Sequence, residues 1–425
     1  MLDINFIREN PELCKKTCIR KGLTDIINDL LAVDSDRRKL KQEIERLRFE
    51  RKKVSESIRK ASEEEKEKII EEARNIREEL ERKDPVLKDV EFRFNELMLL
   101  VPNIPLDEVP VGKTEEDDVT VKEHGIKPEF NFEPKDHVEL GELLDIIDIP
   151  GGVKISGTRN YLLKNEGALL EMALCNFAMK FAIDRGFTPF VVPQLVKRDA
   201  MIGTGYFPIG EEQAYLIEKD DLNLIGTSEV PLVSYLAGNI LKQEELPISL
   251  AGYSTCFRRE AGTYGKDTKG IFRVHQFQKV EQVIFCLNDS DVSRKLHDQL
   301  LKNAEEFLQA LNLPYRVVIC CTGEMGQGQV FKNDLEAWMP SRNIYSETHS
   351  CSSLYDFQSR RLNIRFKPEN GGKNQFPFTL NSTLVASPRI LIPILECNQN
   401  KDGTVNIPKV LTPYMHGITK IEPKL

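Results

Sequence analysis

The sequence predicts a protein of mixed α and β structure in two parts, a helical hairpin followed by a larger globular domain. Apolar residues between Ile26 and Leu100 recur in alternating steps of three and four, which indicates two long helices with coiled-coil spacing. Beyond about Asp118 the pattern changes to alternating helix and strand signals. The segment from Phe257 to Glu281 is predicted as strand, glycine-containing loop and strand, and it gathers charged and aromatic side chains.

The composition is that of a globular protein without a general affinity for nucleic acid. The chain has 425 residues, 40% of them hydrophobic and 30% charged, which is enough for two or three domains with substantial cores. Lys and Arg number 59 against 67 Asp and Glu, so that the net charge is -8. An RNA-binding site would therefore have to be a local basic surface.

The cysteines and the apolar runs indicate a reducing compartment. The nine cysteines are odd in number and never form a Cys-x-x-Cys pair, which favours free thiols. The N-terminal residues lack a basic segment followed by an apolar one, and no apolar run of the sequence approaches the length of a membrane span. We therefore expect a cytoplasmic protein with no membrane partner.

The helical hairpin is predicted to be an antiparallel coiled coil over about residues 26–100. Arg37 and Arg51 share the apolar seam of the first helix, and a polar break at 61–65 separates the helices. Pro85 lies inside the second helix, where it is expected to kink or divide the rod. The apolar seams are Val33, Leu40, Ile44, Leu47, Val54 and Ile58, then Ile69, Ala73, Ile76, Leu80, Leu87, Val90, Phe94 and Leu97.

The first helix of the hairpin is strongly basic. Such a row of cations can follow a phosphate backbone. An ordinary solvated coiled-coil surface is an equally good interpretation of the charges alone. The cationic residues are Arg37, Arg38, Lys39, Lys41, Arg46, Arg48, Arg51, Lys52, Lys53, Arg59 and Lys60.

The hairpin and the globular domain are joined by a stretch rich in proline and acidic residues, from Val101 to about Asp118, which is predicted to be a linker. Further on, apolar positions between Asn165 and Arg185 predict a helix that Gly186 ends. Residues 187–193 are β-prone and predict a strand.

The Phe257–Glu281 segment carries side chains suited to a nucleotide. Residues 253–260 and 271–281 are predicted as its two strands, and the loop contains Gly262, Gly265 and Gly270. Arginine binds phosphate through paired donors and an aromatic ring stacks on a base, although a solvated hairpin with a charged outer face is the alternative. Because strand side chains alternate, one face carries Arg273, His275, Phe277, Lys279 and Glu281.

This segment resembles motif 2 of the class II aminoacyl-tRNA synthetases, and in detail that of the seryl-tRNA synthetase family. The 165–193 helix and strand resemble motif 1. Without the resemblance, Thr227 or Ser228 would be a helix N-cap, and His349 with Cys351 would be an incomplete metal or nucleophile site. Three more segments are similar to that family: Gly226-Thr227-Ser228-Glu229, the block from Glu347 to Ser353, and Thr379 to Arg389, which matches motif 3.

The resemblance implies an α+β fold. A class II catalytic domain built on a mainly antiparallel sheet would occupy residues 109–425, preceded by a tRNA-binding helical arm at residues 1–108. In the family, motif 1 forms a dimer interface, so the resemblance also implies a homodimer.

The resemblance also implies the residues of the site. The catalytic residues would be Arg258, Glu347 and Arg389. The ATP site would add Arg259, Glu260, Val274, Phe277, Thr348, His349 and Ser350. L-Serine would contact Thr227, Ser228, Glu229, Glu260, Lys279, Glu281, Asn381 and Thr383. Mg²⁺ would bind with ATP at the hard oxygen ligands of Glu347 and Ser350. The tRNA would bind Arg37, Lys41, Arg48, Arg51 and Lys52.

The implied activity is ATP-dependent attachment of L-serine to tRNA(Ser) through a seryl-adenylate, with tRNA(Sec) as a second candidate substrate. Three positions depart from the usual pattern of the family: His349, Ser353 and Ser382. They leave open a catalytically silent, synthetase-like paralogue that binds RNA or regulates. A purely structural coiled-coil protein would explain the arm, but not the residues suited to catalysis.

Overall fold

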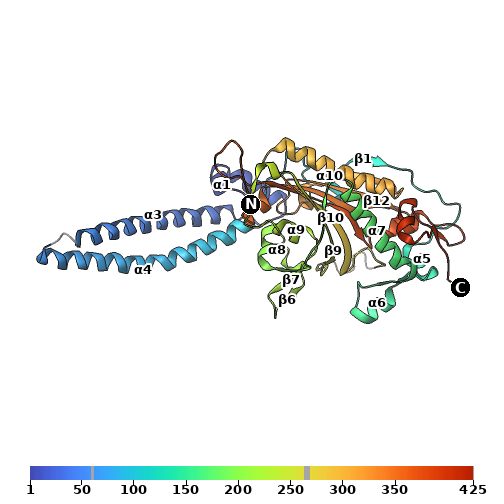
Figure 1. Cartoon of the computed structure of the whole chain (residues 1–425), viewed down its shortest axis with the longest axis horizontal. Coiled ribbons are helices and arrows are strands. Elements are labelled where there is room, and N and C mark those ends of the chain that lie inside the picture. The colour runs from blue at the N-terminus through green and yellow to red at the C-terminus, as the bar shows by residue number, and fades with distance from the viewer. Residues whose placement is uncertain (59–61, 263–268, 425) are drawn as a thin grey trace. The chain divides into compact units, whose positions relative to one another are not determined.

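The computed structural model describes residues 1–58, 62–262 and 269–424, and it divides into two compact units, Met1–Pro102 and Asn103–Leu425 (Figure 1). The predicted contributions of Arg59, Lys60 and Gly265 lie outside the described residues. The helices of the first unit are α1 (Ile4–Glu9), α2 (Pro11–Arg20), α3 (Ile27–Ile58) and α4 (Glu63–Leu100).

Helices α3 and α4 lie side by side as the predicted antiparallel pair (Figure 1). The heptad positions pack into a continuous apolar seam, since an amphipathic helix gains stability mainly by burying its apolar face. Ion pairs flank the seam, such as Lys83 Nζ with Glu43 Oε2 at 2.6 Å. The buried seam residues are Ile44, Leu47, Val54, Ile76, Leu80, Phe94 and Leu97.

Two details of the hairpin differ from the sequence prediction. Arg51 is exposed rather than placed in the seam, because a guanidinium ion loses much of its hydration free energy when it is buried. Helix α4 continues through Pro85 and is not divided there. Both Pro85 and Glu81, whose carbonyl loses its helical partner, are exposed, so water can replace the missing hydrogen bond.

The second unit is built on one large sheet with the strand order β1-β11-β12-β13-β15-β10-β9-β4. Neighbouring strands in it are antiparallel, except for the parallel pair of β4 and β9. These strands are β1 (Val119–His124), β4 (Thr188–Val191), β9 (Ile248–Phe257), β10 (Gln276–Cys286), β11 (Tyr315–Ile319), β12 (Phe331–Met339), β13 (Ile344–Tyr355) and β15 (Phe378–Ser387). The predicted α+β class with a mainly antiparallel sheet is confirmed.

Short strands form small additional sheets. They are β2 (Ile147–Asp148), β3 (Leu162–Leu163), β5 (Leu195–Lys197), β6 (Leu216–Ile217), β7 (Leu222–Leu224), β8 (Ile240–Lys242), β14 (Arg365–Lys367), β16 (Val405–Asn406) and β17 (Lys420–Ile421). The helices of this unit are α5 (His137–Leu143), α6 (Ile149–Ser156), α7 (Asn165–Ile183), α8 (Arg198–Thr204), α9 (Glu229–Ser234), α10 (Ser290–Ala310), α11 (Phe357–Arg361) and α12 (Leu391–Cys397).

The main core lies where α7 and α10, both labelled in Figure 1, and α12 pack against the large sheet. Phe307 of α10 and Leu335 of β12 are among its fully buried side chains. A second, smaller core covers part of the opposite face and includes Val283 and Phe285 of β10.

Two predicted segments take another form. Most of the stretch predicted to be a linker belongs to the second unit. Leu106 N–H donates to Val330 O at 2.9 Å, and Thr322 N–H donates to Pro110 O at 2.9 Å. Residues 271–275 are not a strand, because backbone N–H groups there bond elsewhere; His275 N–H, for example, donates to Arg159 O at 3.1 Å. The strand begins at Gln276.

The cysteines agree with the sequence prediction. The nine cysteines all fall within the described residues, and all are free thiols, as predicted. Within the described parts of the chain, we find no helix that is both long enough and apolar enough to cross a membrane.

Candidate active site

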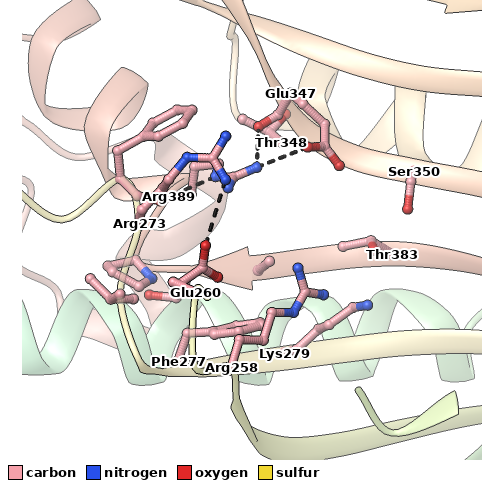
Figure 2. A pocket seen from close by; sticks show the side chains of 15 residues that line it. Arg258, Glu260, Arg273, Phe277, Lys279, Glu347, Thr348, Ser350, Thr383 and Arg389 are labelled. Atoms are coloured by element: carbon pink, nitrogen blue, oxygen red, sulfur yellow. Dashed lines mark hydrogen bonds and ion pairs between the residues drawn. The ribbon is translucent and has the colours of Figure 1, made fainter. Parts of the chain in front are cut away.

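A cleft opens on the face of the sheet opposite α10 and encloses about 580 Å³, open solvent included (Figure 2). It is bordered by the end of β9, by β10, β13 and β15, and by the turn that leads into α12. The residues that line it are Arg258, Glu260, Phe272, Arg273, Val274, Phe277, Lys279, Glu347, Thr348, Ser350, Thr383, Ala386, Ser387, Pro388 and Arg389. Most of the residues predicted from the sequence for ATP thus share one cleft.

The strand register explains how distant segments meet there. Leu335 of β12 pairs with His349 of β13, but the next residue, Glu336, pairs with Glu347. Thr348 is therefore the extra residue of a β-bulge in β13. Glu347, Thr348 and Ser350 can therefore all line the cleft, although strict alternation would turn every second side chain away.

One end of the cleft is strongly cationic. Arg389 Nη1 donates to Glu347 O at 3.0 Å and to Glu347 Oε2 at 3.1 Å (Figure 2). Its guanidinium also lies 4.4 Å from the centre of the Phe272 ring. Arg258 lies 5.1 Å from the centre of the Phe277 ring. An aromatic surface bordered by two arginines fits a base and its phosphates.

Glu260 closes the same end in a strained conformation. Its φ of 52° is in the left-handed region, which is uncommon for a residue with a long side chain. Its Oε2 lies 3.6 Å from Nη1 of Arg273. Its carboxylate lines the cleft together with Arg273, which lies beside Arg389 (Figure 2). Sequence reasoning did not assign Arg273 to ATP.

Glu347 stays ionised in this environment. Desolvation opposes its ionisation, but the cations Arg389, Lys332 and Arg258 outweigh that cost and lower the pKa of the Glu347 carboxyl well below its ordinary value. Lys332 and its partner Asp334, bonded at 2.8 Å, were missed by sequence reasoning because no local pattern connects them to Glu347.

Glu347 and Ser350 fit the donor set of a magnesium ion that binds together with phosphates. Both supply hard oxygen ligands to the cleft. Asp334, the register partner of Ser350, has a buried Oδ1 without a hydrogen-bond partner among the described residues. Within those residues no cluster of three or more His, Cys, Asp or Glu side chains could hold a metal ion by itself.

The inner end of the cleft is a buried polar cluster. Lys279 Nζ lies 2.5 Å from Glu281 Oε2 and donates to Thr227 Oγ1 at 3.1 Å. Thr383 Oγ1 donates to the same Glu281 oxygen at 3.2 Å. Asn381 shares the face of Thr383 because it lies two residues away on β15. The structure thus brings five of the residues predicted for serine into one region.

Glu229, close to this cluster, is held by hydrogen bonds from two side chains that sequence reasoning missed. Tyr206 OH donates to its Oε2 at 2.8 Å, and Gln358 Nε2 donates to its Oε1 at 2.7 Å. Burial and the neighbouring charge of Glu281 raise the pKa of Glu229. Thr383 was suggested by a motif, whereas Tyr206, which follows α8, and Gln358 of α11 carry no sequence signal for this contact.

Three predicted contacts point elsewhere. His349 is buried with its ring bonded to Thr348 Oγ1 at 2.9 Å and Leu384 O at 3.0 Å, and burial lowers its pKa to about 4. Ser228 Oγ donates to a backbone carbonyl of β9 at 2.9 Å. Arg259 donates to the carbonyl of residue 212 rather than into the cleft. None of these side chains is among those that line the cleft.

The other two departures from the family pattern also face away from the cleft. Ser353 Oγ lies 3.1 Å from Ser293 Oγ of α10. Ser382 is the register partner of Cys351, whose sulfur contacts the carbonyl of His297 on α10 at 3.7 Å. With His349, all three departures lie on the α10 side of the sheet, so they leave the lining of the cleft unchanged.

A second, wider cavity of about 1050 Å³ adjoins the cleft. It shares Arg258, Glu260, Arg273, Glu347 and Arg389 with the first. Apolar residues form much of its remaining wall, including Met201, Ala214, Leu224 and Phe257. Two ligands could therefore meet at the shared residues.

The five residues predicted for tRNA lie on α3, and three of them are already paired. Lys41 Nζ lies 2.6 Å from Glu91, and Arg48 lies 3.2 Å from Asp84. Arg37 pairs with Asp34 at 2.9 Å and lies over the Phe94 ring, while Arg51 and Lys52 are exposed.

Comparisons with known proteins identify the class first. The model of the class II tRNA synthetase core domain (G, H, P, S and T) matches residues 215–398, which contain the cleft. A prolyl-tRNA synthetase from Giardia lamblia, in complex with prolyl-adenylate, shares only the fold, with a TM-score of 0.57 at 16% identity over 65% of this chain and 55% of its own. The catalytic unit is a class II aminoacyl-tRNA synthetase fold.

The rest of the chain narrows the class to one family. The seryl-tRNA synthetase N-terminal domain model matches residues 1–105. A serine–tRNA ligase from Deinococcus radiodurans is 46% identical over 98% of both chains, and one from Rubrobacter xylanophilus is 41% identical over the same share. The Pyrococcus horikoshii seryl-tRNA synthetase complexed with ATP has a TM-score of 0.94 at 39% identity, covering 100% of both chains. This chain belongs to the seryl-tRNA synthetase family.

Proposed function

We propose that this synthetase activates L-serine with ATP to a seryl-adenylate and then transfers serine to tRNA(Ser). The observation that carries the proposal is the joining of two chemically different ends in one cleft. Arg389, Arg258 and Phe277 form an end suited to a nucleotide, and the buried Lys279–Glu281 pair forms an end suited to a small polar amino acid. The match to relatives named serine–tRNA ligase supports it.

The first step needs positioning more than acid–base chemistry. The serine carboxylate is already ionised at neutral pH and attacks the α-phosphorus of ATP, which releases pyrophosphate. Arg258 stabilises charge at the α-phosphate and Arg389 at the γ-phosphate, while the adenine stacks on Phe277 beside Val274. When bound, Mg²⁺ would be held by Glu347 and Ser350 and would neutralise phosphate charge.

The inner end recognises serine. Glu229 pairs with the ammonium group, and Glu281 with Thr383 receives the hydroxyl. A site built around a hydroxyl rejects alanine because its buried polar groups would be left without a partner, a penalty that can reach about 10⁴-fold. Threonine is excluded by shape.

The second step brings the terminal ribose of the tRNA to the adenylate. The adjoining cavity shares its arginines and acids with the first cleft, and we assign it to the end of the tRNA. Residues 1–108 serve as the tRNA-binding arm and residues 109–425 as the catalytic domain. The exposed Arg51 and Lys52, with Arg37, Lys41 and Arg48, contact the tRNA backbone.

We further propose a cytoplasmic homodimer that packs through the region of α7, with tRNA(Sec) as a second substrate to be tested. The free thiols fit a reducing compartment. Exposed apolar side chains on and next to α7, such as Met172 at 62% and Ile155 at 71%, fit an interface between subunits.

Serine-dependent ATP–pyrophosphate exchange tests the proposal. Arg258→Ala should abolish the exchange, whereas Arg74→Ala, an exposed arginine of α4, should leave it unchanged. Near-normal exchange by Arg258→Ala would reject its role. Absence of exchange in the unmodified protein would favour the silent paralogue, although the three departures that suggested it face α10 rather than the cleft.

A further inference from the structure

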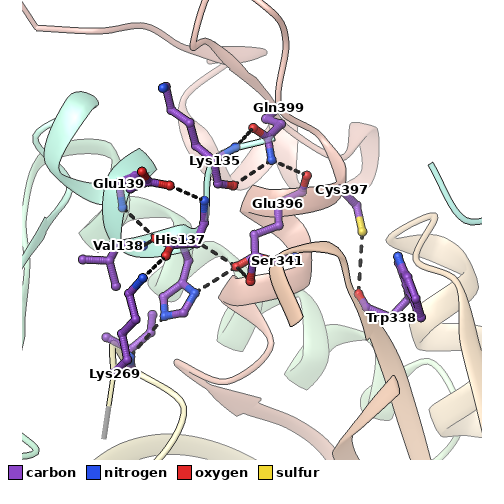
Figure 3. Close-up of polar contacts among 12 residues, drawn as sticks. Lys135, His137, Val138, Glu139, Lys269, Trp338, Ser341, Glu396, Cys397 and Gln399 are labelled. Carbon is purple, nitrogen blue, oxygen red and sulfur yellow. Dashed lines mark hydrogen bonds and ion pairs between the residues drawn. The ribbon is translucent and has the colours of Figure 1, made fainter. Parts of the chain in front are cut away.

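A polar cluster behind the cleft joins α5, α12 and the turn Pro340–Arg342 to the backbone of residues 269–272 (Figure 3). Its centre is Glu396 of α12, which is 0% exposed. Glu396 accepts from His137 N–H at 3.0 Å and lies 2.9 Å from His137 Nδ1. It also accepts from Ser341 N–H at 3.0 Å and Ser341 Oγ at 2.8 Å.

These bonds fix the tautomer of His137. A carboxylate only accepts hydrogen bonds, so Nδ1 carries a proton, and Nε2, which faces a backbone N–H group, is the acceptor nitrogen. Nε2 receives the backbone N–H of Ile271 at 3.4 Å. His137 therefore links a buried carboxylate on one side to the backbone that enters the cleft on the other.

Gly270 makes this link possible. Its φ is +75°, and a Cβ atom there would lie 1.9 Å from His137 Nε2. Only glycine allows the imidazole to approach the backbone of Ile271 so closely.

The linked backbone leads directly to the phosphate end of the cleft. Phe272 follows Ile271, and its carbonyl accepts from Arg389 Nε at 3.4 Å. The Phe272 ring lies 4.4 Å from the Arg389 guanidinium and 4.6 Å from that of Arg342. Arg342 directly follows Ser341, and Ser341 is the residue that donates to Glu396. One carboxylate thus holds both the backbone before Phe272 and the turn that carries Arg342.

We propose that His137 is a positioning residue for ATP: held by Glu396, it fixes the backbone at Ile271 and so places Phe272 against Arg389. This inference rests on the proposed assignment of the cleft to ATP. A nucleophilic role for Ser341 does not fit, because Ser341 bonds to the acid and not to the histidine, and His137 is only 6% exposed.

The decisive test compares His137→Gln with His137→Asn. A glutamine carbonyl reaches about as far as Nε2 and can accept from Ile271, whereas an asparagine amide reaches only the place of Nδ1 and can donate to Glu396. In ATP–pyrophosphate exchange, Asn should raise the KM for ATP by about 3- to 10-fold, the value of one hydrogen bond. His137→Gln should keep the KM for ATP close to that of the unmodified protein. The KM for serine should stay within about twofold in both variants.

A merely structural role gives a different pattern. It would lower kcat and the melting temperature in both variants with the KM for ATP unchanged, or favour Asn over Gln, and either result would overturn the inference. His124→Gln, an exposed histidine of β1, is the matched control and should behave as the unmodified protein. If the unmodified protein neither exchanges pyrophosphate nor binds ATP, the proposed function itself fails.

Gly270→Ala supplies an independent measurement. It should raise the KM for ATP as His137→Asn does, because its Cβ displaces the imidazole. Adding Gly270→Ala to His137→Ala should raise the KM less than adding it to the unmodified protein, since the clashing ring is gone. Strictly additive effects would contradict the proposed link.

Discussion

Substitution of Glu281 tests serine recognition most sharply. The side chain is 2% exposed and pairs with Lys279, which is 6% exposed, at 2.5 Å. Thr383 donates to the same oxygen, Oε2. The other carboxylate oxygen, Oε1, is the acceptor that we assign to the serine hydroxyl. Glu281→Gln keeps the volume and removes the charge.

The expected loss follows from the type of bond. A hydrogen bond to a charged group contributes about 1.5–3 kcal/mol, so kcat/KM for serine should fall by about 10- to 150-fold. Alanine has no hydroxyl, so its kcat/KM should change little and the serine-to-alanine ratio should fall by a similar factor. The assay is ATP–pyrophosphate exchange with serine, alanine and threonine at saturating ATP.

Stability has to be measured beside selectivity. Removing one partner of a buried ion pair costs about 3–5 kcal/mol, because Lys279 would be left buried without its counter-ion. Adding Lys279→Met should recover much of the melting temperature but none of the selectivity. A Glu281→Gln protein that folds normally and keeps its serine-to-alanine ratio within twofold would refute the assignment.

Three further predictions concern other parts of the molecule. Because the pKa of Glu229 is raised above its ordinary 4.5, the ionised carboxylate lowers the stability of the folded protein above that pH. Glu229→Gln should therefore raise the melting temperature at pH 8, and this gain should disappear towards pH 4. The same variant should lower kcat/KM for serine by about 10- to 150-fold. Replacing Arg48, Arg51 and Lys52 together by Glu should leave pyrophosphate exchange intact and weaken tRNA binding, and the dependence of log affinity on log salt concentration should become shallower by about 3. The control, Arg74→Glu with Arg77→Glu on α4, should change neither exchange nor tRNA binding. Equal losses of exchange and charging would reject the arm assignment. Ser350→Ala should raise the Mg²⁺ concentration for half-maximal exchange by about fivefold, and an unchanged Mg²⁺ dependence would remove Ser350 from the metal site.

The arm and the fold class were accessible from the sequence because periodic patterns decide them. The seam through Ile44, Leu47 and Leu80 is buried as the heptad spacing predicted. Arg51 was misplaced since periodicity does not record the cost of burying a charge. The division expected at Pro85 is absent, because the effect of a proline depends on whether water reaches the freed carbonyl.

The site was predictable as a set of residues, but not in its geometry. Motif likeness indicated Glu347 and Ser350, yet only the bulge at Thr348 shows how both reach the cleft. Strict alternation could not reveal that residues 271–275 leave the sheet, because His137 binds there from 134 residues away. Tyr206 and Gln358 were missed for the same reason, since they meet Glu229 only in the folded chain.

The two faces of β13 and β15 have a practical consequence for protein engineering. Ser350 and Thr383 face the cleft, whereas His349 and Ser382 belong to the packing layer under α10. A redesign of that layer can alter thermal tolerance through side-chain volume while the chemistry on the other face is left as it is. Libraries that randomise positions 349, 353 and 382 together would therefore be a good starting point for a hardier synthetase.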